Sequence, residues 1–485
     1  MESLLLKIKN GESILLDKIP VLKIADFRNF IIYKTKNGER VCSFFGLPES
    51  PNTVKLFAVI TINETSELEI ISTIIHNNYL SITPDCPQVH LFEREILENF
   101  KMFPESHPWI KPVRNNNDNF FKVKGEQIHE VAVGPVHAGI IEPGHFRFQC
   151  EGETVLHLEI ALGYQHRGIE KALIGGPDRR TIMMIETIAG DTTIGHTLAY
   201  CQLYESLADM KVPARAEYIR AIALELERLA NHTGDLGALA NDVGFLPTSS
   251  YCGRLRGDFL NMTALICGNR FGRSLIKPGG VSFDIDEKML IELRKRIHDT
   301  YIEVKQAVEL LWDSASVMTR FTDTGKITDE ACTELGLVGL AARACGIERD
   351  VRYEFPTGIF KYFQVPVSSW PTGDVFARAY VRWMEIERSI KFIKDLLEEF
   401  PSGVIRNNIR NLEPNRFGIS LTEGWRGEIC HCAITGTDGK FVSYKVVDPS
   451  FHNWTGLAMA LRNQQISDFP LCNKSFNLSY CGFDL

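Results

Sequence analysis

The sequence predicts an α+β chain, in which a small N-terminal α/β domain precedes a mainly helical domain with peripheral β-structure. Runs rich in β-branched and aromatic residues lie near both ends, whereas long segments with helical apolar spacing fill the middle. A polar run at 114–119, Arg-Asn-Asn-Asn-Asp-Asn, has no apolar periodicity and is the best boundary. We therefore expect one domain at 1–114, a linker at 115–125 and a second domain at 126–485.

The N-terminal domain is predicted to combine two strands with a helix. Val41–Phe45 and Thr53–Thr61 carry the β-branched and aromatic residues that favour strands. Asn63–His76 is predicted to be helical, because apolar residues recur at helical spacing. The residues with this spacing are Leu68, Ile71 and Ile75.

The second domain begins with a strand-like region at Ile128–Gln149 and then becomes helical. The predicted long helices are Pro213–Ala240, Lys288–Thr319 and Asp374–Phe400. Strands return at Gly427–Thr435 and Lys440–Val447, joined by the turn sequence Thr437-Asp-Gly439.

Composition narrows the class of protein. The chain is 44% hydrophobic and 24% charged, which is typical of a globular protein, and its net charge of −8 with no basic run argues against a nucleic-acid partner. No apolar stretch reaches the roughly 18–20 residues that span a bilayer. The N-terminus does not look like a signal peptide. We therefore expect a cytoplasmic protein with twelve reduced cysteines, attached to a membrane only through partner subunits.

Several motifs resemble subunits of respiratory complex I. Leu91-Phe-Glu-Arg-Glu95 followed by Met102-Phe-Pro-Glu-Ser-His-Pro108 resembles the signature of the 30-kDa subunit. From about residue 126 the chain resembles the 49-kDa subunit and the large subunit of membrane-bound group 4 nickel–iron hydrogenases. The landmarks, in chain order, are Gly134-Pro-Val-His137, Glu142-Pro-Gly-His145, His166-Arg-Gly-Ile-Glu-Lys171, Glu227-Arg-Leu-Ala-Asn-His232, Gly268-Asn-Arg270, Gly279-Gly280, Arg343-Ala-Cys-Gly346, Gly373-Asp374 and Glu423-Gly-Trp-Arg-Gly-Glu428. Fusion of the two subunits in one chain is characteristic of complexes of the formate hydrogenlyase or hydrogenase-4 type.

The two segments that resemble the hydrogenase metal motifs lack their cysteines. Thr187-Ile-Ala-Gly-Asp-Thr-Thr-Ile-Gly-His196 resembles R-x-C-G-x-C-x-x-x-H, and the segment 475–485 resembles D-P-C-x-x-C. The four ligand positions fall on Ala189, Thr192, Ser479 and Gly482. These residues supply no thiolate for nickel and iron, so we expect no metal on this chain and no hydrogen turnover.

The resemblance also implies a cavity beside the terminal iron–sulfur cluster of a partner subunit. In complex I this cavity receives a quinone headgroup, between the loop that matches Gly134–His145 and the segment near Gly190. His145 matches the histidine that contacts quinone, and His137 matches another histidine of the loop. Gly190 matches the tyrosine and has no hydroxyl, so the quinone site is also incomplete. Tyr164 or Tyr200 could provide the missing donor.

Asp191 adds a carboxylate where the family has a metal cage or a tyrosine. Near His137, His145 or His196 it could relay protons, since histidine titrates near neutral pH. The alternative is a helix cap, because aspartate is favoured at the position before a helix that begins at Thr192.

Two further residues have both a functional and a structural interpretation. The resemblance places Arg167 near the partner's cluster, where a fixed positive charge raises the reduction potential. Its structural alternative is a buried ion pair with Glu159 or Glu170. His196 matches the histidine that closes the hydrogenase motif, and without the thiolates we expect it to make a structural hydrogen bond.

Other patterns in the chain do not indicate a cofactor. Cys430-His-Cys432 lies on a predicted strand, where both sulfurs share one face and the imidazole lies on the other. No second pair with zinc spacing accompanies it. The sequence has no dinucleotide-binding glycine fingerprint and no P-loop, so we expect no NAD site on this chain although NADH occurs in the family's name.

Three functions remain open. The leading one is a redox-coupling subunit of a membrane-bound complex related to complex I and group 4 hydrogenases, on the inner face of the cell membrane. Its expected partners are an iron–sulfur small subunit, which would hold the cluster, and antiporter-like membrane subunits. The second is a quinone-reducing subunit, and the third is a non-catalytic scaffold that keeps the fold.

Overall fold

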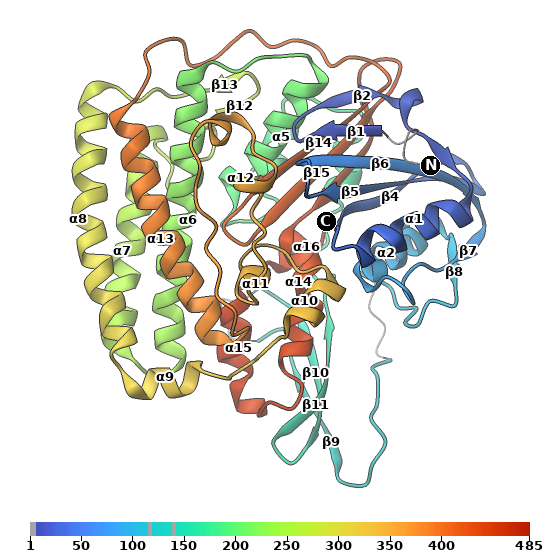
Figure 1. Ribbon diagram of the computed structural model, residues 1–485, viewed down its shortest axis with the longest axis horizontal. Coiled ribbons are helices and arrows are strands. Elements are labelled where there is room, and N and C mark those ends of the chain that lie inside the picture. The colour runs from blue at the N-terminus through green and yellow to red at the C-terminus, as the bar shows by residue number, and fades with distance from the viewer. Residues whose placement is uncertain (1–5, 115–118, 138–141) are drawn as a thin grey trace.

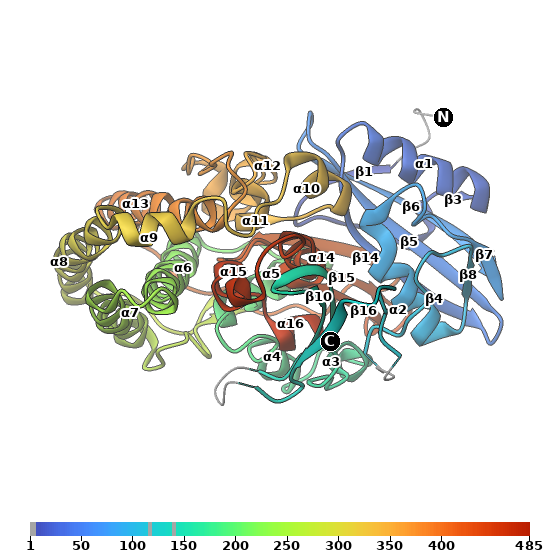
Figure 2. The same cartoon turned by 90° about the horizontal axis from the view of Figure 1, so that it is seen from below.

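The computed structural model describes residues 6–114, 119–137 and 142–485. Figure 1 shows a bundle of long helices on one side, the N-terminal sheet on the other, and a second sheet with short helices between them. Figure 2, seen from below, shows the same order of parts. The predicted α+β class is confirmed.

The N-terminal part is built on a seven-stranded sheet. Its strands follow the order β4-β5-β6-β7-β8, and β1 and β3 also pair with β6. Helix α1 lies against β6, and α2 lies against β4. The bounds are β1 Leu6–Lys9, β3 Val21–Leu22, α1 Ile24–Lys36, β4 Val41–Ser50, β5 Thr53–Ile62, β6 Glu67–His76, β7 Asn78–Leu80, α2 His90–Phe100 and β8 Phe103–Glu105, with short 3₁₀ turns at Leu16–Lys18 and Pro87–Val89.

The predicted helix at Asn63–His76 is wrong, because this segment forms a turn and then strand β6. Strand β6 has β5 on one side and β1 and β3 on the other. As a central strand it is buried on both faces, so it reads as a nearly continuous apolar run in which helical spacing arises by chance. Its isoleucines and threonine are β-branched and favour the extended form.

The second sheet links the two ends of the chain. Its order is β16-β15-β14-β2, so β2 near the N-terminus pairs with β14. The predicted strands and their hairpin turn are confirmed. Phe417 of β14 stacks on Phe45 and Phe57 of the N-terminal sheet, with ring centroids 6.4 and 6.0 Å away, so the two sheets share one core. The bounds are β2 Ser13–Leu15, β14 Arg416–Glu423, β15 Glu428–Thr435 and β16 Phe441–Val447.

The long helices form a bundle around α6, which packs against α7 and α13. The predicted helices at Pro213–Ala240 and Asp374–Phe400 are confirmed. The prediction of one helix at Lys288–Thr319 is wrong, because the chain breaks at Asp313 and Ser314. Side chains of aspartate and serine compete for backbone hydrogen bonds and favour such breaks. The bounds are α6 Ala214–Asp242, α7 Leu246–Cys267, α8 Glu287–Trp312, α9 Ala315–Phe321 and α13 Val375–Glu398.

The remaining elements surround the centre of the molecule. The predicted strand-like region at Ile128–Gln149 contributes two strands of a three-stranded sheet with the order β11-β10-β9. These strands are β9 Ile128–Val133, β10 His145–Glu151 and β11 Thr154–Ala161. The short elements are α3 Ile169–Leu173, α4 Thr181–Ile185, α5 Thr193–Leu207, β12 Ile276–Lys277, β13 Gly280–Val281, α10 Asp329–Leu335, α11 Gly339–Arg343, α12 Val351–Glu354, α14 Pro449–Ala460, α15 Phe469–Phe476 and α16 Tyr480–Phe483, with 3₁₀ turns at Gly358–Lys361 and Ile466–Asp468.

No helix within residues 6–114, 119–137 and 142–485 has the length and apolar character required to cross a membrane.

Candidate functional site

The two metal-motif segments meet through the side chain of Arg426. Its Nη1 and Nη2 atoms each donate to one oxygen of Asp191 at 2.7 Å, and Nη1 also lies 3.2 Å from Thr192 Oγ1. Its Nε atom donates to the backbone oxygen of Asn477. One guanidinium therefore joins the loop before α5 to the segment before α16.

Arg426 is held in place by the connection between β14 and β15. The neighbouring Trp425 donates from Nε1 to Asp191 O at 3.0 Å and to Thr192 Oγ1 at 3.1 Å. The Arg426 guanidinium lies 3.9 Å from the centre of the Trp425 ring, a cation–π contact. Both side chains are buried. The connection between β14 and β15 thus places the Arg426 guanidinium and the Trp425 indole against the same loop, at Asp191 and Thr192.

The residues at the four ligand positions do not fit a nickel–iron centre. Ala189, Thr192, Ser479 and Gly482 are all buried, and none offers sulfur. Ser479 Oγ instead accepts from Gly482 N at 2.9 Å.

The space at position 482 is also filled. A Cβ atom placed on Gly482 would lie 2.7 Å from Asp448 Oδ2. The thiol that lies closest in sequence, Cys481, has its pKa raised to about 12 by burial and so stays protonated. Among the described residues there is no cluster of three or more His, Cys, Asp or Glu that could hold a metal. Soft-metal chemistry therefore does not fit this site.

Asp191 does not cap helix α5, so the capping prediction is wrong. The backbone nitrogens of Ile194 and Gly195 donate to Glu227 at 2.7 and 3.1 Å. Burial raises the pKa of Glu227 to about 8, although these two hydrogen bonds oppose the shift. Burial also opposes ionisation of Asp191, but Arg426 lowers the pKa of that carboxyl below its usual value. Glu227 of α6 therefore accepts the hydrogen bonds of the first α5 amides, and Asp191 pairs with Arg426 instead.

An open hollow of about 520 Å³ lies beside Gly190. Arg167 borders it and donates to the backbone oxygens of Thr187 and Ile188, both at 2.8 Å. A Cβ atom on Gly190 would meet nothing within 4 Å. The lining residues are Glu142, Tyr164, Gln165, His166, Arg167, Thr187, Gly190, Arg273 and Cys481.

Arg167 does not form the ion pairs considered from its sequence. Glu159 pairs with Lys111, and Glu170 pairs with Lys445. The side chain of Arg167 is exposed and is fixed through backbone carbonyls. Its positive charge therefore faces the hollow without an ion-pair partner among the described residues, and its predicted place near a partner's cluster stays a prediction.

The two candidate histidines of the loop, His137 and His145, are not among the residues that line the hollow. His145 begins β10, is buried, and accepts from Arg147 Nε at 2.9 Å. The His137 ring lies 5.6 Å from Phe146 and 6.3 Å from Tyr480, and burial lowers its pKa. Part of the loop between them, residues 138–141, is outside the described residues.

Of the two tyrosines considered as replacement donors, only Tyr164 lines the hollow. Tyr200 is buried within α5 and does not.

His196 makes the structural hydrogen bonds expected of it. Its Nε2 lies 3.0 Å from Asp448 Oδ2, and its Nδ1 lies 3.1 Å from His431 Nε2. On strand β15 the His431 imidazole faces α5, whereas Cys430 and Cys432 lie together with their sulfurs 3.7 Å apart. This is the alternation that the sequence predicts.

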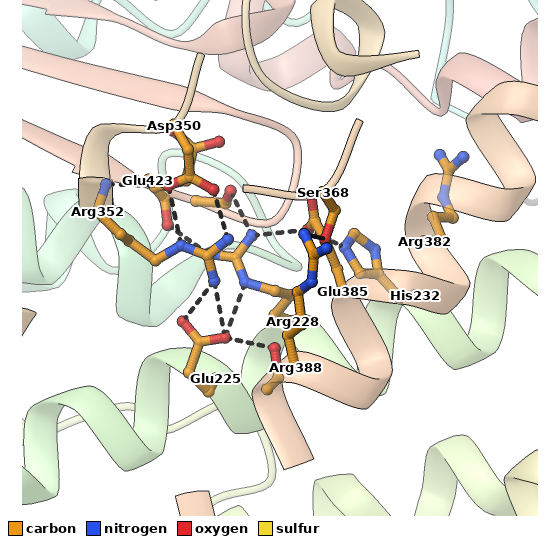
Figure 3. Close-up of polar contacts among 12 residues, drawn as sticks. Glu225, Arg228, His232, Asp350, Arg352, Ser368, Arg382, Glu385, Arg388 and Glu423 are labelled. Carbon is orange, nitrogen blue, oxygen red and sulfur yellow. Dashed lines mark hydrogen bonds and ion pairs between the residues drawn. The ribbon is translucent and has the colours of Figure 1, made fainter. Parts of the chain in front are cut away.

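A buried network of carboxylates and guanidinium groups supports the site (Figure 3). In the figure, Glu385 of α13 points toward His232 of α6, and the Glu385–His232 distance is 2.8 Å. Glu385 also accepts from Arg343 Nε at 3.0 Å. The other charged members are Glu225, Arg228, Asp350, Arg352 and Glu423.

This network ties the helix bundle to the β-hairpin that carries Arg426. Arg228 of α6 donates to the backbone oxygens of Glu423 and Gly424 at 2.7 and 3.0 Å. Arg343 donates to the Glu423 carboxylate at 2.7 Å. Because β14 ends at Glu423, these bonds fix the turn that begins there.

Sequence reasoning missed Arg426, Glu227, His431 and Asp448 as parts of the site. Arg426 and Glu227 lie within motifs that carried the family resemblance, but spacing alone could not show that they contact Asp191 and α5. The spacing of Cys430-His-Cys432 predicts which strand face His431 occupies, but not its contact with His196.

The chain is similar to known proteins over most of its length. Residues 242–418 match the family "Respiratory-chain NADH dehydrogenase, 49 Kd subunit". The chain is 29% identical to the carbon monoxide-induced hydrogenase of Rhodospirillum rubrum, over 72% of this chain and 97% of that protein. It is 27% identical to formate hydrogenlyase subunit 5 of Escherichia coli, over 83% of this chain and 76% of the relative. It is 30% identical to NADH-quinone oxidoreductase subunit 4 of Thermus thermophilus, over 70% and 90% respectively.

Proposed function

The chain belongs to the family of the 49-kDa subunit of respiratory-chain NADH dehydrogenase, and from this premise we propose that it is the large subunit of a membrane-bound, complex I-like oxidoreductase. In this proposal it couples electron transfer to ion translocation and does not turn over hydrogen. Relatives with large-subunit sequences of this kind include a membrane-bound hydrogenase subunit alpha and hydrogenase-4 component G.

The observation that carries the proposal is Arg426, whose guanidinium pairs with Asp191 in one metal-motif segment and donates to the backbone oxygen of Asn477 in the other. A guanidinium cannot bind a metal cation, and its 2.7 Å bonds to Asp191 fill the region with the protein's own charges. Where the related hydrogenases have thiolates, this chain has hydrogen bonds among its own polar groups. The Asp191 carboxylate accepts from the Arg426 guanidinium, and the Trp425 indole donates to the Asp191 backbone oxygen. This supports a subunit that keeps the architecture of the family but uses different chemistry at its centre.

The partners follow from the same premise. We propose an iron–sulfur small subunit against the hollow, with Arg167 close to its terminal cluster, and antiporter-like membrane subunits that hold the complex on the inner face of the cell membrane. The exposed, backbone-anchored Arg167 supports this placement, because a fixed positive charge near a cluster raises its reduction potential.

The hollow supports quinone as the electron acceptor, as a second candidate function. Its volume of about 520 Å³ is within the range of small-molecule sites, and Gly190 leaves its wall open. Tyr164, His166 and Arg167 provide polar groups at its rim. His137 and His145 do not line the hollow, so this second candidate function does not depend on them.

One purification tests both candidates. The chain would be tagged in its native host, gently solubilised from membranes, and analysed for co-purifying subunits, iron and nickel. We expect an iron-containing complex without nickel that reduces a soluble quinone analogue and is inactive with hydrogen. Nickel near one equivalent, or hydrogen turnover, would contradict the proposal. Recovery of the chain alone and without iron would indicate a scaffold.

A further inference from the structure

A small cavity of about 100 Å³ lies where helix α2 of the N-terminal part meets helix α14 and strand β11. Ten of the fifteen residues that line it are apolar. The five polar ones are His90, Arg94, His157, Thr455 and Arg462. Among the residues that the structure describes, no aspartate or glutamate lines this cavity. Its two arginines therefore bring positive charge to a mostly apolar space.

The lining positions on the two helices share one face of each helix. On α2 they are positions 90, 91 and 94, and on α14 they are positions 454, 455, 458 and 459. Residues three or four positions apart lie on the same side of a helix, so this spacing turns their side chains toward the cavity. Arg94 belongs to this face of α2, and Arg462 follows the end of α14.

Arg94 differs from the other buried arginines. Of the ten arginines that are buried in the described part of the chain, eight form an ion pair with a carboxylate. Arg378 forms none, but it donates from all three nitrogens, to Ser475 Oγ and two backbone oxygens. Arg94 donates only from Nε to Lys111 O at 2.6 Å and from Nη2 to Pro112 O at 2.9 Å.

The third nitrogen of Arg94 is available to a ligand. Nη1 has no hydrogen-bond partner among the described residues, and it is not one of the polar atoms that the protein closes off from solvent. The residue as a whole is only 9% exposed. Burial lowers the pKa of Arg94 to about 10, although Glu159, which is paired with Lys111, opposes the shift. The guanidinium thus keeps an unused donor and no carboxylate of its own.

Arg462 provides a second positive charge at the cavity. Its side chain is exposed and makes no ion pair with a carboxylate in the described ranges. After the larger effect of burial, its charge lowers the pKa of His157, so the two groups interact. Two guanidinium groups beside one small cavity repel each other, and an anion between them would reverse that effect.

We propose that this cavity binds a small organic carboxylate. The carboxylate would accept hydrogen bonds from Arg94 Nη1 and from Arg462, since guanidinium groups pair well with carboxylates. The apolar part of the ligand would contact the apolar lining, which includes Trp109, whose ring centre lies 5.2 Å from Arg94 Cζ. A volume of about 100 Å³ is below the roughly 300 Å³ of sites for drug-sized ligands, so the ligand is small.

A purely structural role for Arg94 explains less. Fixing the chain at Lys111 and Pro112 uses two of the three nitrogens and leaves Nη1 without a role. It also does not require a second arginine at the same cavity. The site shares no lining residue with the hollow beside Gly190, so it does not depend on the proposed electron acceptor. A bound carboxylate would join α2 of the N-terminal part to α14 and β11 of the second part.

Benzoate is a suitable probe, because it combines a carboxylate with a small apolar ring. Calorimetric titration of the purified complex with sodium benzoate should show one site per chain, with a dissociation constant of about 1 mM or lower. Benzamide has the same shape without the charge and should bind at least about 10-fold more weakly. Absence of saturable benzoate binding, or equal binding of benzamide, would overturn the proposal. Inorganic phosphate that binds as tightly as benzoate would overturn the assignment to an organic carboxylate.

Four variants of the complex locate the site. Arg94→Gln should weaken benzoate binding by about 10- to 100-fold, and Arg462→Gln should weaken it severalfold. Ala458→Leu keeps both charges but fills part of the cavity, so it should also weaken binding. Arg296→Gln is the matched control, because Arg296 is an exposed arginine of α8 that pairs with Glu292, and it should leave binding unchanged.

Thermal melting of each variant establishes that it is folded. If Arg94→Gln does not fold, Arg462→Gln and Ala458→Leu still decide the question, because neither residue makes a side-chain hydrogen bond or ion pair among the described residues. Benzoate affinity in both variants equal to that of the unaltered complex would overturn the site.

Discussion

The Arg426 guanidinium holds the Asp191 carboxylate in two parallel hydrogen bonds of 2.7 Å. This fork–fork geometry is among the stronger polar contacts in proteins, because both partners are charged and both bonds are aligned. It joins the two segments that resemble the metal motifs of hydrogenases, in a chain that has no cysteine at their ligand positions. Arg426 therefore links these two segments, through its pair with Asp191 and its hydrogen bond to the backbone oxygen of Asn477.

Asp191→Asn should lower the free energy of unfolding by about 1–3 kcal/mol, because one charge-assisted hydrogen bond is lost and the buried Arg426 keeps an unmatched donor. Denaturant unfolding of the purified protein measures this change. Glu303→Gln is the control, since Glu303 pairs with Arg254 at the surface with side-chain exposures of 45% and 51%. That change should cost less than about 1 kcal/mol. Equal effects of the two changes would contradict the importance assigned to Arg426–Asp191.

Gly482→Ala should destabilise the protein by about 1–3 kcal/mol, because overpacking forces neighbouring groups to move. The added Cβ would lie 2.7 Å from Asp448 Oδ2, and Asp448 is held by His196 and by Ser450 N. Gly190→Ala is the matched change in the facing segment, where a Cβ would meet nothing within 4 Å. Thermal melting should separate the two variants.

The same reasoning predicts a partial rescue. Asp448→Ala removes the closest obstacle to a Cβ at position 482 and leaves Ser479 Oγ as a close contact at 2.9 Å, so in that background the added cost of Gly482→Ala should shrink without vanishing. If that cost stays the same in both backgrounds, the contact with Asp448 is not its source.

Sequence patterns predicted the long helices and the C-terminal hairpin well, because amphipathic spacing and a turn sequence act locally. They failed at β6, where burial on both faces removes the period-two alternation that identifies a strand. They also failed at Asp313, where a locally plausible helix breaks in two. The lack of cysteine at the four ligand positions is read directly from the sequence, because it depends on residue type alone. The partners of Asp191 and His196 could not, since Arg426 and Asp448 lie more than two hundred positions away in the chain.

Acid should destabilise the protein through His90, the partly buried first residue of α2, and His452, a buried residue of α14. Burial lowers the pKa of His90 to about 3 and that of His452 to about 4, both from an ordinary value of 6.5. The unfolded chain therefore binds more protons than the folded one below pH 6.5. The stabilisation is present above that pH and is lost as the pH falls toward 4, at up to about 1.4 kcal/mol per pH unit for each histidine.

His452→Phe should make the pH profile of unfolding less steep between pH 6.5 and 4. The His452 ring already lies 5.8 Å from the Phe92 ring and its Nε2 has no partner among the described residues, so a phenyl ring suits the space. His298→Gln, at an exposed position, should leave the profile unchanged. A profile for His452→Phe that parallels the unaltered protein would assign acid sensitivity to other groups.

Glu385→Gln should be the most damaging of these changes, with a loss of about 3–5 kcal/mol in unfolding free energy, because it leaves buried cations without their shared carboxylate. Glu385 accepts from Arg343 at 3.0 Å and lies 2.8 Å from His232 Nε2, and its side chain is 1% exposed. Glu387→Gln alters the same helix two residues later, at an exposed position that contacts Tyr301, and should cost less than about 1 kcal/mol. Because Arg343 also holds Glu423 at the end of β14, Glu385→Gln should further loosen the turn that carries Arg426. Amide hydrogen exchange at residues 424–427 measures that effect, and protection equal to that of Glu387→Gln would show that the network does not position the turn.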